Sequence, residues 1–319
     1  MTTVALHPPI VIDAHQHVWD LTRAHYGWLG PDTPQINRTI EMAELLPQLS
    51  VSGVPATVLV QSADNAADSD YMFEVAAEHD EVVGVVAWLP LNRAGEAADR
   101  LAALQRNPLF VGVRSLIHDL PDPDWLLRPE VDEGLALLEA AEVPFDLVAV
   151  LPRHLELVPI LSERHPSLRI VIDHLGKPPL GAADPEPWRS LIRTAAENPL
   201  VFGKVSGLYA PGGSGAPAAI EQLRPAVDHA LEIFGPDRLM YGGDWPISVL
   251  FGGYSAVHGD LAGVLSGLDQ REHGRVWGET ARDFYRLDSS RLATGGATAP
   301  AVASAPSAPS APVTSEGQS

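Results

Sequence analysis

The chain has 319 residues, 45% of them hydrophobic and 19% charged, which allows a large core in one domain. Its formal net charge of −20 argues against nucleic acid or an anionic membrane surface as a partner, because phosphate binding needs clustered lysine and arginine. The lack of cysteine excludes disulfides, zinc–thiolate sites and cysteine nucleophiles, and it fits a cytoplasmic protein. We expect no membrane segment and no signal peptide, because no apolar run approaches a bilayer span and the first residues lack a basic segment followed by an apolar core.

Eight short apolar runs are the main structural signal, and they cover residues 10–13, 56–60, 82–88, 110–113, 144–148, 169–172, 200–205 and 239–241. They are apolar on both faces, which is typical of parallel strands covered by helices. Segments with helical spacing lie between them, at residues 41–46, 71–79, 94–105, 131–141, 154–164, 187–197 and 220–234. This alternation predicts an α/β fold, a closed (β/α)8 barrel. An open doubly wound sheet is the alternative, although neither a GxGxxG nor a Walker motif follows any run.

The end of the chain changes in composition. From Ala293 onward it reads ATGGATAPAVASAPSAPSAPVTSEGQS, with no aromatic residue after Tyr285. Such a segment cannot bury enough apolar surface to offset the entropy lost on ordering. We therefore expect a single barrel domain over residues 1–288 and a disordered tail over residues 289–319.

The tripeptide His15-Gln16-His17 directly follows the first apolar run. Side chains two positions apart on a strand point the same way, so His15 and His17 should project together from its carboxyl end. Two imidazoles aimed at one point can ligate a metal or polarise a carbonyl. Two unrelated surface histidines in a loop are the simpler interpretation.

Polar side chains stand at or directly after the ends of nearly all the apolar runs, the first one included. In a (β/α)8 barrel these positions line one pocket. The residues in question are Asp13, His15, His17, Gln61, Arg114, His118, Asp146, Asp173, His174, Lys177, Lys204, Ser206 and Asp244. Random loop polarity would less readily supply histidines, an arginine and an aspartate directly after apolar strands.

Three of these side chains suggest specific chemistry. Asp244 follows two glycines that let the backbone approach the pocket closely, and it can act as a general base, as a metal ligand or simply as a turn aspartate. Arg114 offers a planar fork for a carboxylate or a polarised carbonyl, or else it forms a structural ion pair. Lys177 can stabilise an oxyanion or serve as an ion-pair partner inside the barrel.

The number of metal ions is limited by the fourth and fifth runs. The fourth run ends in Arg114 without the lysine or glutamate that would bridge two metals, and the fifth ends without a histidine. A two-metal site is therefore not expected, which leaves one metal or none.

Six segments together resemble the amidohydrolase superfamily, in the amidohydrolase-related (amidohydrolase 2) branch that includes L-fuconolactone and L-rhamnonolactone hydrolases. They are IDAHQHVWD, YGWLG, FVGVRSLIHD, PFDLVAVLPRHLELVPILSERHPSLRIVIDHLGKP, VFGKVSGL and YGGDWP, and the likeness extends from about Ile12 to Phe284. The resemblance implies a (β/α)8 barrel and a carboxylic ester hydrolase that opens sugar-acid lactones.

The resemblance also implies roles for individual residues. Asp244 would activate water, His15, His17 and His174 would surround the scissile carbonyl, and Arg114 would orient the substrate. The enzyme would need no metal, or it would hold one divalent ion, zinc or manganese, through His15, His17 and Asp244.

The expected partner is a small lactone. Gln61, Lys177, Trp28 and Trp245 join Arg114 as candidate substrate-binding residues, because aromatic faces suit the C–H faces of a sugar ring. Ordinary core packing is the alternative for the tryptophans. Two other functions stay open, a metal-dependent decarboxylase of the same barrel family and a non-catalytic sugar-acid-binding barrel.

Overall fold

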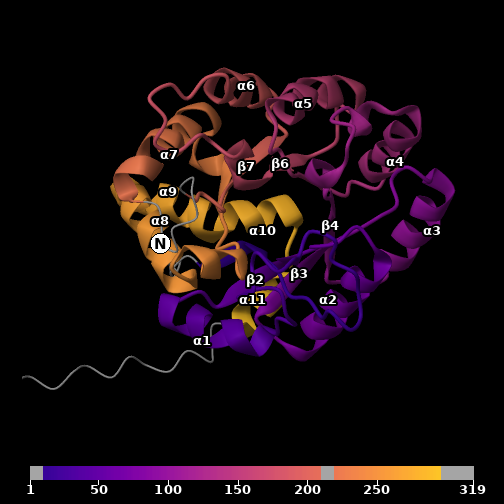
Figure 1. Ribbon diagram of the computed structural model, residues 1–319, viewed down its shortest axis with the longest axis horizontal. Helices are drawn as coiled ribbons and strands as arrows, with labels where there is room; N and C mark the ends of the chain where they lie inside the picture. The colour runs from indigo at the N-terminus through magenta and orange to yellow at the C-terminus, as the bar shows by residue number, and fades with distance from the viewer. Residues whose placement is uncertain (1–9, 210–218, 296–319) are drawn as a thin grey trace, which may run out of the picture.

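The computed structural model describes residues 10–209 and 219–295, and in this part of the chain eight parallel strands form one sheet in the order β1 to β8. The strands are β1 (Ile12–Gln16), β2 (Ala56–Val60), β3 (Val82–Ala87), β4 (Phe110–Ser115), β5 (Phe145–Leu147), β6 (Ile170–Ile172), β7 (Val201–Val205) and β8 (Leu239–Tyr241). A parallel bridge between Gln16 and Trp245 joins the two ends of the sheet. The predicted (β/α)8 barrel is therefore confirmed (Figure 1).

Helices pack around this barrel, most of them on its outer side (Figure 1). They are α1 (Met42–Ser52), α2 (Ala66–Glu78), α3 (Ala94–Leu104), α4 (Pro129–Ala140), α5 (Pro152–Arg164), α6 (Trp188–Ala195), α7 (Ile220–Phe234), α8 (Tyr254–Val264), α9 (Gln270–Gly274), α10 (Thr280–Tyr285) and α11 (Ser289–Gly295). The first seven lie where the helical spacing placed them, whereas α8 to α11 come after the last predicted segment. No helix in residues 10–209 or 219–295 is long and apolar enough to cross a membrane.

Local sequence signals set where these helices begin and end. Asn65 precedes α2, and its side chain accepts a hydrogen bond from the backbone N–H of Asp68 at 2.9 Å, as a helix cap does. Gly53 ends α1 in the left-handed conformation, with φ of 68°. Pro129 stands at the start of α4, where its missing N–H costs no helical hydrogen bond.

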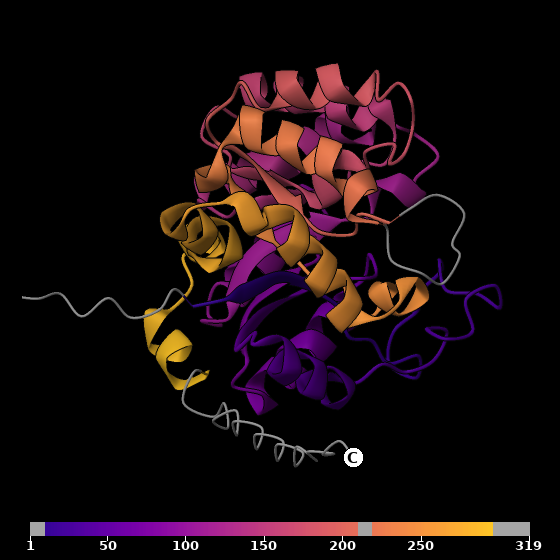
Figure 2. The same ribbon diagram turned by 90° about the vertical axis from the view of Figure 1, so that its left-hand side faces the viewer.

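At the end of the barrel that the C-terminal helices close, the interior is apolar. Buried side chains from several strands meet there, among them Ile12, Ala14, Val58, Val171 and Met240. Phe284 and Tyr285 of α10 pack against this cluster. Figure 2 shows α11 at this end of the barrel, opposite the long loop that follows β1.

The helix α11 differs from the expectation of a disordered tail from residue 289. It forms over Ser289–Gly295, and its Leu292 is buried against the apolar cluster of the barrel interior. One apolar residue in this segment therefore has a packing partner. The rest of the expected tail, residues 296–319, lies outside the described residues.

A β-bulge in β1 sets the direction of the His15-Gln16-His17 side chains. Asp13 pairs with Thr57 but Gln16 pairs with Leu59, so one extra residue is inserted on β1. Asp13 and Gln16 therefore share the outer side of the barrel, where Asp13 accepts a hydrogen bond from Tyr254 of α8 at 2.8 Å. His15 and His17 are left to point inward.

Candidate active site

A cavity of roughly 210 Å³, here called the inner cavity, opens at the carboxyl ends of the strands. It is lined by His17, Trp28, Ser62, Arg114, Leu116, His118, Val148, Val150, His174, Lys177, Asp244 and Ile247. Residues predicted from separate strands are thus brought together, as the barrel interpretation required.

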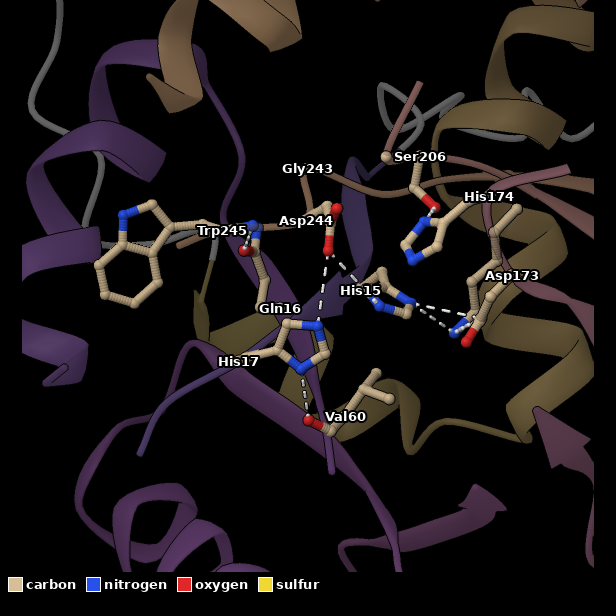
Figure 3. Close-up of polar contacts among 12 residues, drawn as sticks. His15, Gln16, His17, Val60, Asp173, His174, Ser206, Gly243, Asp244 and Trp245 are labelled. Atoms are coloured by element: carbon tan, nitrogen blue, oxygen red, sulfur yellow. Dashed lines mark hydrogen bonds and ion pairs between the residues drawn. The ribbon is translucent and has the colours of Figure 1, made fainter. Parts of the chain in front are cut away.

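Asp244 lies beside both histidines of the first strand (Figure 3). Its Oδ1 is 3.5 Å from His17 Nε2 and 3.7 Å from His15 Nε2. The backbone N–H of Asp244 donates to the His15 carbonyl at 2.8 Å, which fixes the two segments against each other. The imidazole pair and the carboxylate therefore share one small site.

The tautomer of His17 follows from its hydrogen bond. Its Nδ1 lies 2.7 Å from the carbonyl oxygen of Val60, which can only accept, so Nδ1 carries the proton. In the neutral ring, Nε2 then presents a lone pair toward Asp244. A lone pair facing a carboxylate calls for a cation between them, which can be a proton or a metal ion.

His15 lies deeper, above a buried group of charges. Its Nδ1 is 3.1 Å from Lys204 Nζ, which can donate, and 3.4 Å from Asp173 Oδ1, which can accept. Lys204 can donate to Nδ1 when it is unprotonated, and Asp173 can accept from Nδ1 when it is protonated, so both neutral tautomers of the ring have a partner. Burial lowers the pKa of His15 to about 3, so the ring is neutral near pH 7.

The third histidine of the site, His174, is oriented by a hydroxyl. Its Nδ1 lies 2.8 Å from Ser206 Oγ at the end of β7. The backbone of Gly207 passes so close that a Cβ there would lie 2.3 Å from His174 Nδ1. Burial holds the pKa of His174 well below its usual range, so this ring is also neutral.

A left-handed turn after β6 presents His174 and Lys177 together. The φ angles of His174, Leu175, Gly176 and Lys177 are 55°, 50°, 66° and 54°. The turn is closed by the Lys177 N–H, which donates to the His174 carbonyl at 2.9 Å. Left-handed backbone at non-glycine residues costs about 1–2 kcal/mol each, and such strain concentrates at functional sites. This conformation gave no signal in the sequence.

The charges around Asp244 favour its ionised form. Burial by itself raises the pKa of Asp244, but its interactions with His174, His17, His15 and Lys177 outweigh burial and hold its pKa well below the usual range. Burial also lowers the pKa of Lys177. The site therefore holds an ionised carboxylate beside three imidazoles and the Lys177 side chain.

Arg114 forms the structural ion pair weighed from the sequence, and it also faces the inner cavity. Its Nε donates to Asp173 at 2.8 Å and one terminal nitrogen donates to the Gln61 carbonyl at 2.8 Å, so the structural ion pair is present. The same side chain lines the inner cavity. Gln61 does not line it, because its side-chain amide donates to the Arg114 carbonyl and to Asp64, each at 3.0 Å. Gln61 thus supports Arg114 from behind.

Lys204 and Asp146 form the floor beneath the site. Both are fully buried, they pair with each other, and Lys204 also pairs with Asp173 at 3.1 Å. Lys204 therefore has a structural role as an ion-pair partner of two buried carboxylates. Tyr285 of α10 donates to Asp146 at 2.8 Å from below.

The two predicted aromatic residues, Trp28 and Trp245, differ in where their rings lie. Trp28 lines the inner cavity, and its indole N–H donates to the Ser62 carbonyl at 2.7 Å. The indole of Trp245 is buried and points away from Asp244 and the histidines (Figure 3). Trp19 is buried and packs edge-on against Trp28, with ring centroids 5.3 Å apart.

The apolar wall of the inner cavity was not anticipated. Leu116, Val148, Val150 and Ile247 contribute to it from the loops after β4, β5 and β8. Apolar residues in loops carry no chemical signature, so nothing in the sequence could have singled them out.

The site fits one divalent metal ion. Ligand atoms of His15, His17 and Asp244 lie within 4.8 Å of one another, and His15 Nε2 is a buried polar atom without a hydrogen-bond partner. Two imidazoles and a carboxylate form a donor set that zinc accepts. A second group, which joins His15 with Asp173 and His174, meets the same distance, but Arg114 and Lys204 already bind Asp173.

Curated relatives resemble almost the whole chain. An L-fucono-1,5-lactonase of Burkholderia ambifaria is 35% identical over 285 residues, which cover 87% of this chain and 96% of that protein. An L-fucono-1,5-lactonase of Burkholderia multivorans is 32% identical over 290 residues, with coverage of 86% and 96%.

Solved structures and a family model agree with these relatives. The crystal structure of an amidohydrolase from Burkholderia multivorans with bound zinc has a TM-score of 0.80 and 30% identity, and the match covers 88% of this chain and 100% of that one. Residues 12–287 match the family model described as amidohydrolase. The chain therefore belongs to the amidohydrolase family.

Proposed function

We propose that this protein hydrolyses the lactone of a sugar acid, of the L-fucono- or L-rhamnono-lactone kind, with water activated by Asp244. The observation that carries the proposal is the placement of the Asp244 carboxylate against His15 and His17 in a cavity that also holds Arg114 and Lys177. The names of the two Burkholderia relatives support a lactone as the substrate.

The chemistry of a lactone matches what these side chains offer. Asp244 takes a proton from water as the water adds to the lactone carbonyl. The same carboxyl group then returns that proton to the ring oxygen as the C–O bond breaks. One aspartate therefore serves first as base and then as acid.

Donors on the cavity wall would stabilise the oxyanion. Lys177, Arg114 and His174 line the inner cavity with polar N–H groups, and one well-placed donor contributes about 3–4 kcal/mol to the transition state. The positive charges of Lys177 and Arg114 also favour the carboxylate product. They form a local exception to the net charge of −20 of the chain.

His15, His17 and Asp244 are the residues that would hold a divalent ion. Such an ion, when bound, polarises a carbonyl oxygen or lowers the pKa of a bound water. His17 keeps its Nε2 lone pair available for this purpose through its hydrogen bond to Val60.

A panel of aldonolactones tests the proposal, with acid release followed by pH-stat in parallel assays with and without a chelator. We expect hydrolysis of 6-deoxy or hexose 1,5-lactones, and we expect Asp244→Asn to fold normally and to lose at least about a hundredfold in rate. Retained activity in this variant would remove Asp244 from the mechanism. Release of carbon dioxide from a carboxylated substrate, or binding of a sugar acid without turnover of any lactone, would replace the proposal by one of the two alternatives.

A further inference from the structure

A second, larger cavity lies beside the inner cavity, and we propose that it binds a hydroxylated ring attached to the lactone, so that the substrate carries a second sugar unit. This outer cavity has a volume of roughly 810 Å³. Loops after β1, β2 and β4, together with the first turn of α2, line it with Arg23, Ala24, His25, Gly27, Trp28, Ala63, Asp64, Asn65, Ala67, Leu116, Asp119 and Leu120. The inference rests on the proposed function, because it extends the same substrate.

The two cavities share part of their walls. Trp28 and Leu116 line both of them. The Trp28 ring is held in place, because its N–H donates to the Ser62 carbonyl and it packs at right angles to the Trp19 ring. A fixed aromatic side chain between the two cavities suits a ligand with two rings, since each ring can place its C–H groups against the indole.

The volumes of the two cavities indicate which part of the ligand each one would hold. The inner cavity, at roughly 210 Å³, is smaller than the about 300–1,000 Å³ typical of pockets for larger organic ligands, whereas the outer cavity lies within that range. A single lactone ring therefore suffices for the inner cavity. The outer cavity has room for a further ring.

The charges of the outer cavity favour a neutral, hydroxylated group. The Arg23 guanidinium is neutralised by Glu74, which accepts two hydrogen bonds from it at 2.5 and 2.7 Å. Asp64 and Asp119 bring carboxylates, which accept hydrogen bonds from hydroxyl groups and repel anions. A phosphate or a second carboxylate on the ligand would be disfavoured here.

Asp64 connects the outer cavity to the inner one. Its Oδ1 accepts from the Gln61 amide at 3.0 Å and from the Leu116 backbone N–H at 2.9 Å. Its second oxygen has no hydrogen bond from any described residue, so it can accept one from a ligand. Because Gln61 also binds Arg114, both cavities are built on one connected wall.

The test compares lactones that differ by one sugar ring. We expect the kcat/KM of cellobiono- or maltobiono-1,5-lactone to exceed that of glucono-1,5-lactone by about tenfold or more in the wild-type protein. Ala67 is exposed on the first turn of α2, and it lines the outer cavity but not the inner one, so Ala67→Phe places an aromatic ring at the outer cavity. This variant should lose the gain from the second ring and keep the activity on glucono-1,5-lactone. Ala77→Phe is the matched control, since Ala77 is exposed on the same helix and lines neither cavity.

Calorimetry separates failure of this inference from failure of the proposed function. Cellobiitol and sorbitol are not hydrolysed, so their binding reports on the cavities even when no lactone is turned over. Tighter binding of cellobiitol than of sorbitol, lost in Ala67→Phe and kept in Ala77→Phe, supports the outer cavity as a sugar site. Equal binding of the two alditols, together with no gain in kcat/KM from the second ring, overturns the inference whether or not monosaccharide lactones are hydrolysed.

Discussion

Substitution of Gly207 by alanine tests how closely the site depends on the position of His174. Gly207 has φ of 55°, and an added Cβ would lie 2.3 Å from His174 Nδ1 and 2.9 Å from Asp244 Oδ2. Ordinary contacts of a Cβ begin near 3.4 Å, so the imidazole has to move by about 1 Å. That movement breaks the 2.8 Å hydrogen bond between His174 and Ser206. A misplacement of this size costs about a hundredfold in rate.

The matched control is Gly53→Ala. Gly53 has a similar φ of 68°, but no atom lies within 4 Å of an added Cβ. Both variants carry the backbone cost of a left-handed alanine, about 1 kcal/mol, which lowers the melting temperature of a domain of this size by roughly 2–4 °C.

The assay measures lactone hydrolysis and thermal unfolding by circular dichroism for the two variants. We expect both variants to fold, with the lower melting temperature in Gly207→Ala because its buried neighbours have to shift, and we expect kcat/KM to fall about a hundredfold in Gly207→Ala and to stay unchanged in Gly53→Ala. If Gly207→Ala keeps its activity within about twofold, His174 does not need its observed position and the reasoning fails.

Three further predictions concern other contacts. Ser206→Ala should lower kcat by about tenfold with little change in melting temperature, because His174 loses the group that orients it. A kcat equal to that of the wild type would contradict this role of Ser206. Burial raises the pKa of Asp68 to about 6 from an unfolded value near 3.8, so the folded state binds this proton more tightly than the unfolded state does. The free energy of unfolding should therefore fall by on the order of 3 kcal/mol as the pH rises from about 4 to 6. Urea unfolding at several pH values should show this loss in the wild type and a flatter profile in Asp68→Asn. In Gly134→Ala the added Cβ would lie 2.3 Å from the Leu91 carbonyl oxygen, so the melting temperature should drop. Neither residue lines the inner cavity, so kcat/KM of the folded protein should stay the same.

The barrel could be predicted from the sequence because its strands are buried on both faces. Runs such as residues 56–60 and 239–241 are mostly apolar, and the structure has strands at the same residues. The first strand is shifted to Ile12–Gln16, because polar residues that are buried at its end look like loop residues in a sequence. The helices after β8 gave weaker periodic signals and were not anticipated.

Several features of the site depend on backbone geometry that composition does not reveal. The bulge in β1 turns Asp13 outward, although its position after an apolar run suggested the pocket. The left-handed turn that aligns His174 with Lys177 involves residue types that seldom adopt positive φ. Trp245 follows Asp244 directly, and its indole nevertheless points to the other side of the chain. Spacing along the sequence could identify the strand ends but could not give these directions.

The hydrogen bond from Tyr285 to Asp146 links the far end of the barrel to the chemistry at its mouth. Tyr285 sits beneath Lys204, with the ammonium 5.6 Å from its ring centre, and Lys204 in turn contacts His15. The closing helix therefore acts as a seal that keeps bulk solvent from the charges under the imidazole. Shortening the protein ahead of this tyrosine would admit water from below and weaken electrostatic interactions throughout the interior, even with each side chain at the mouth left intact.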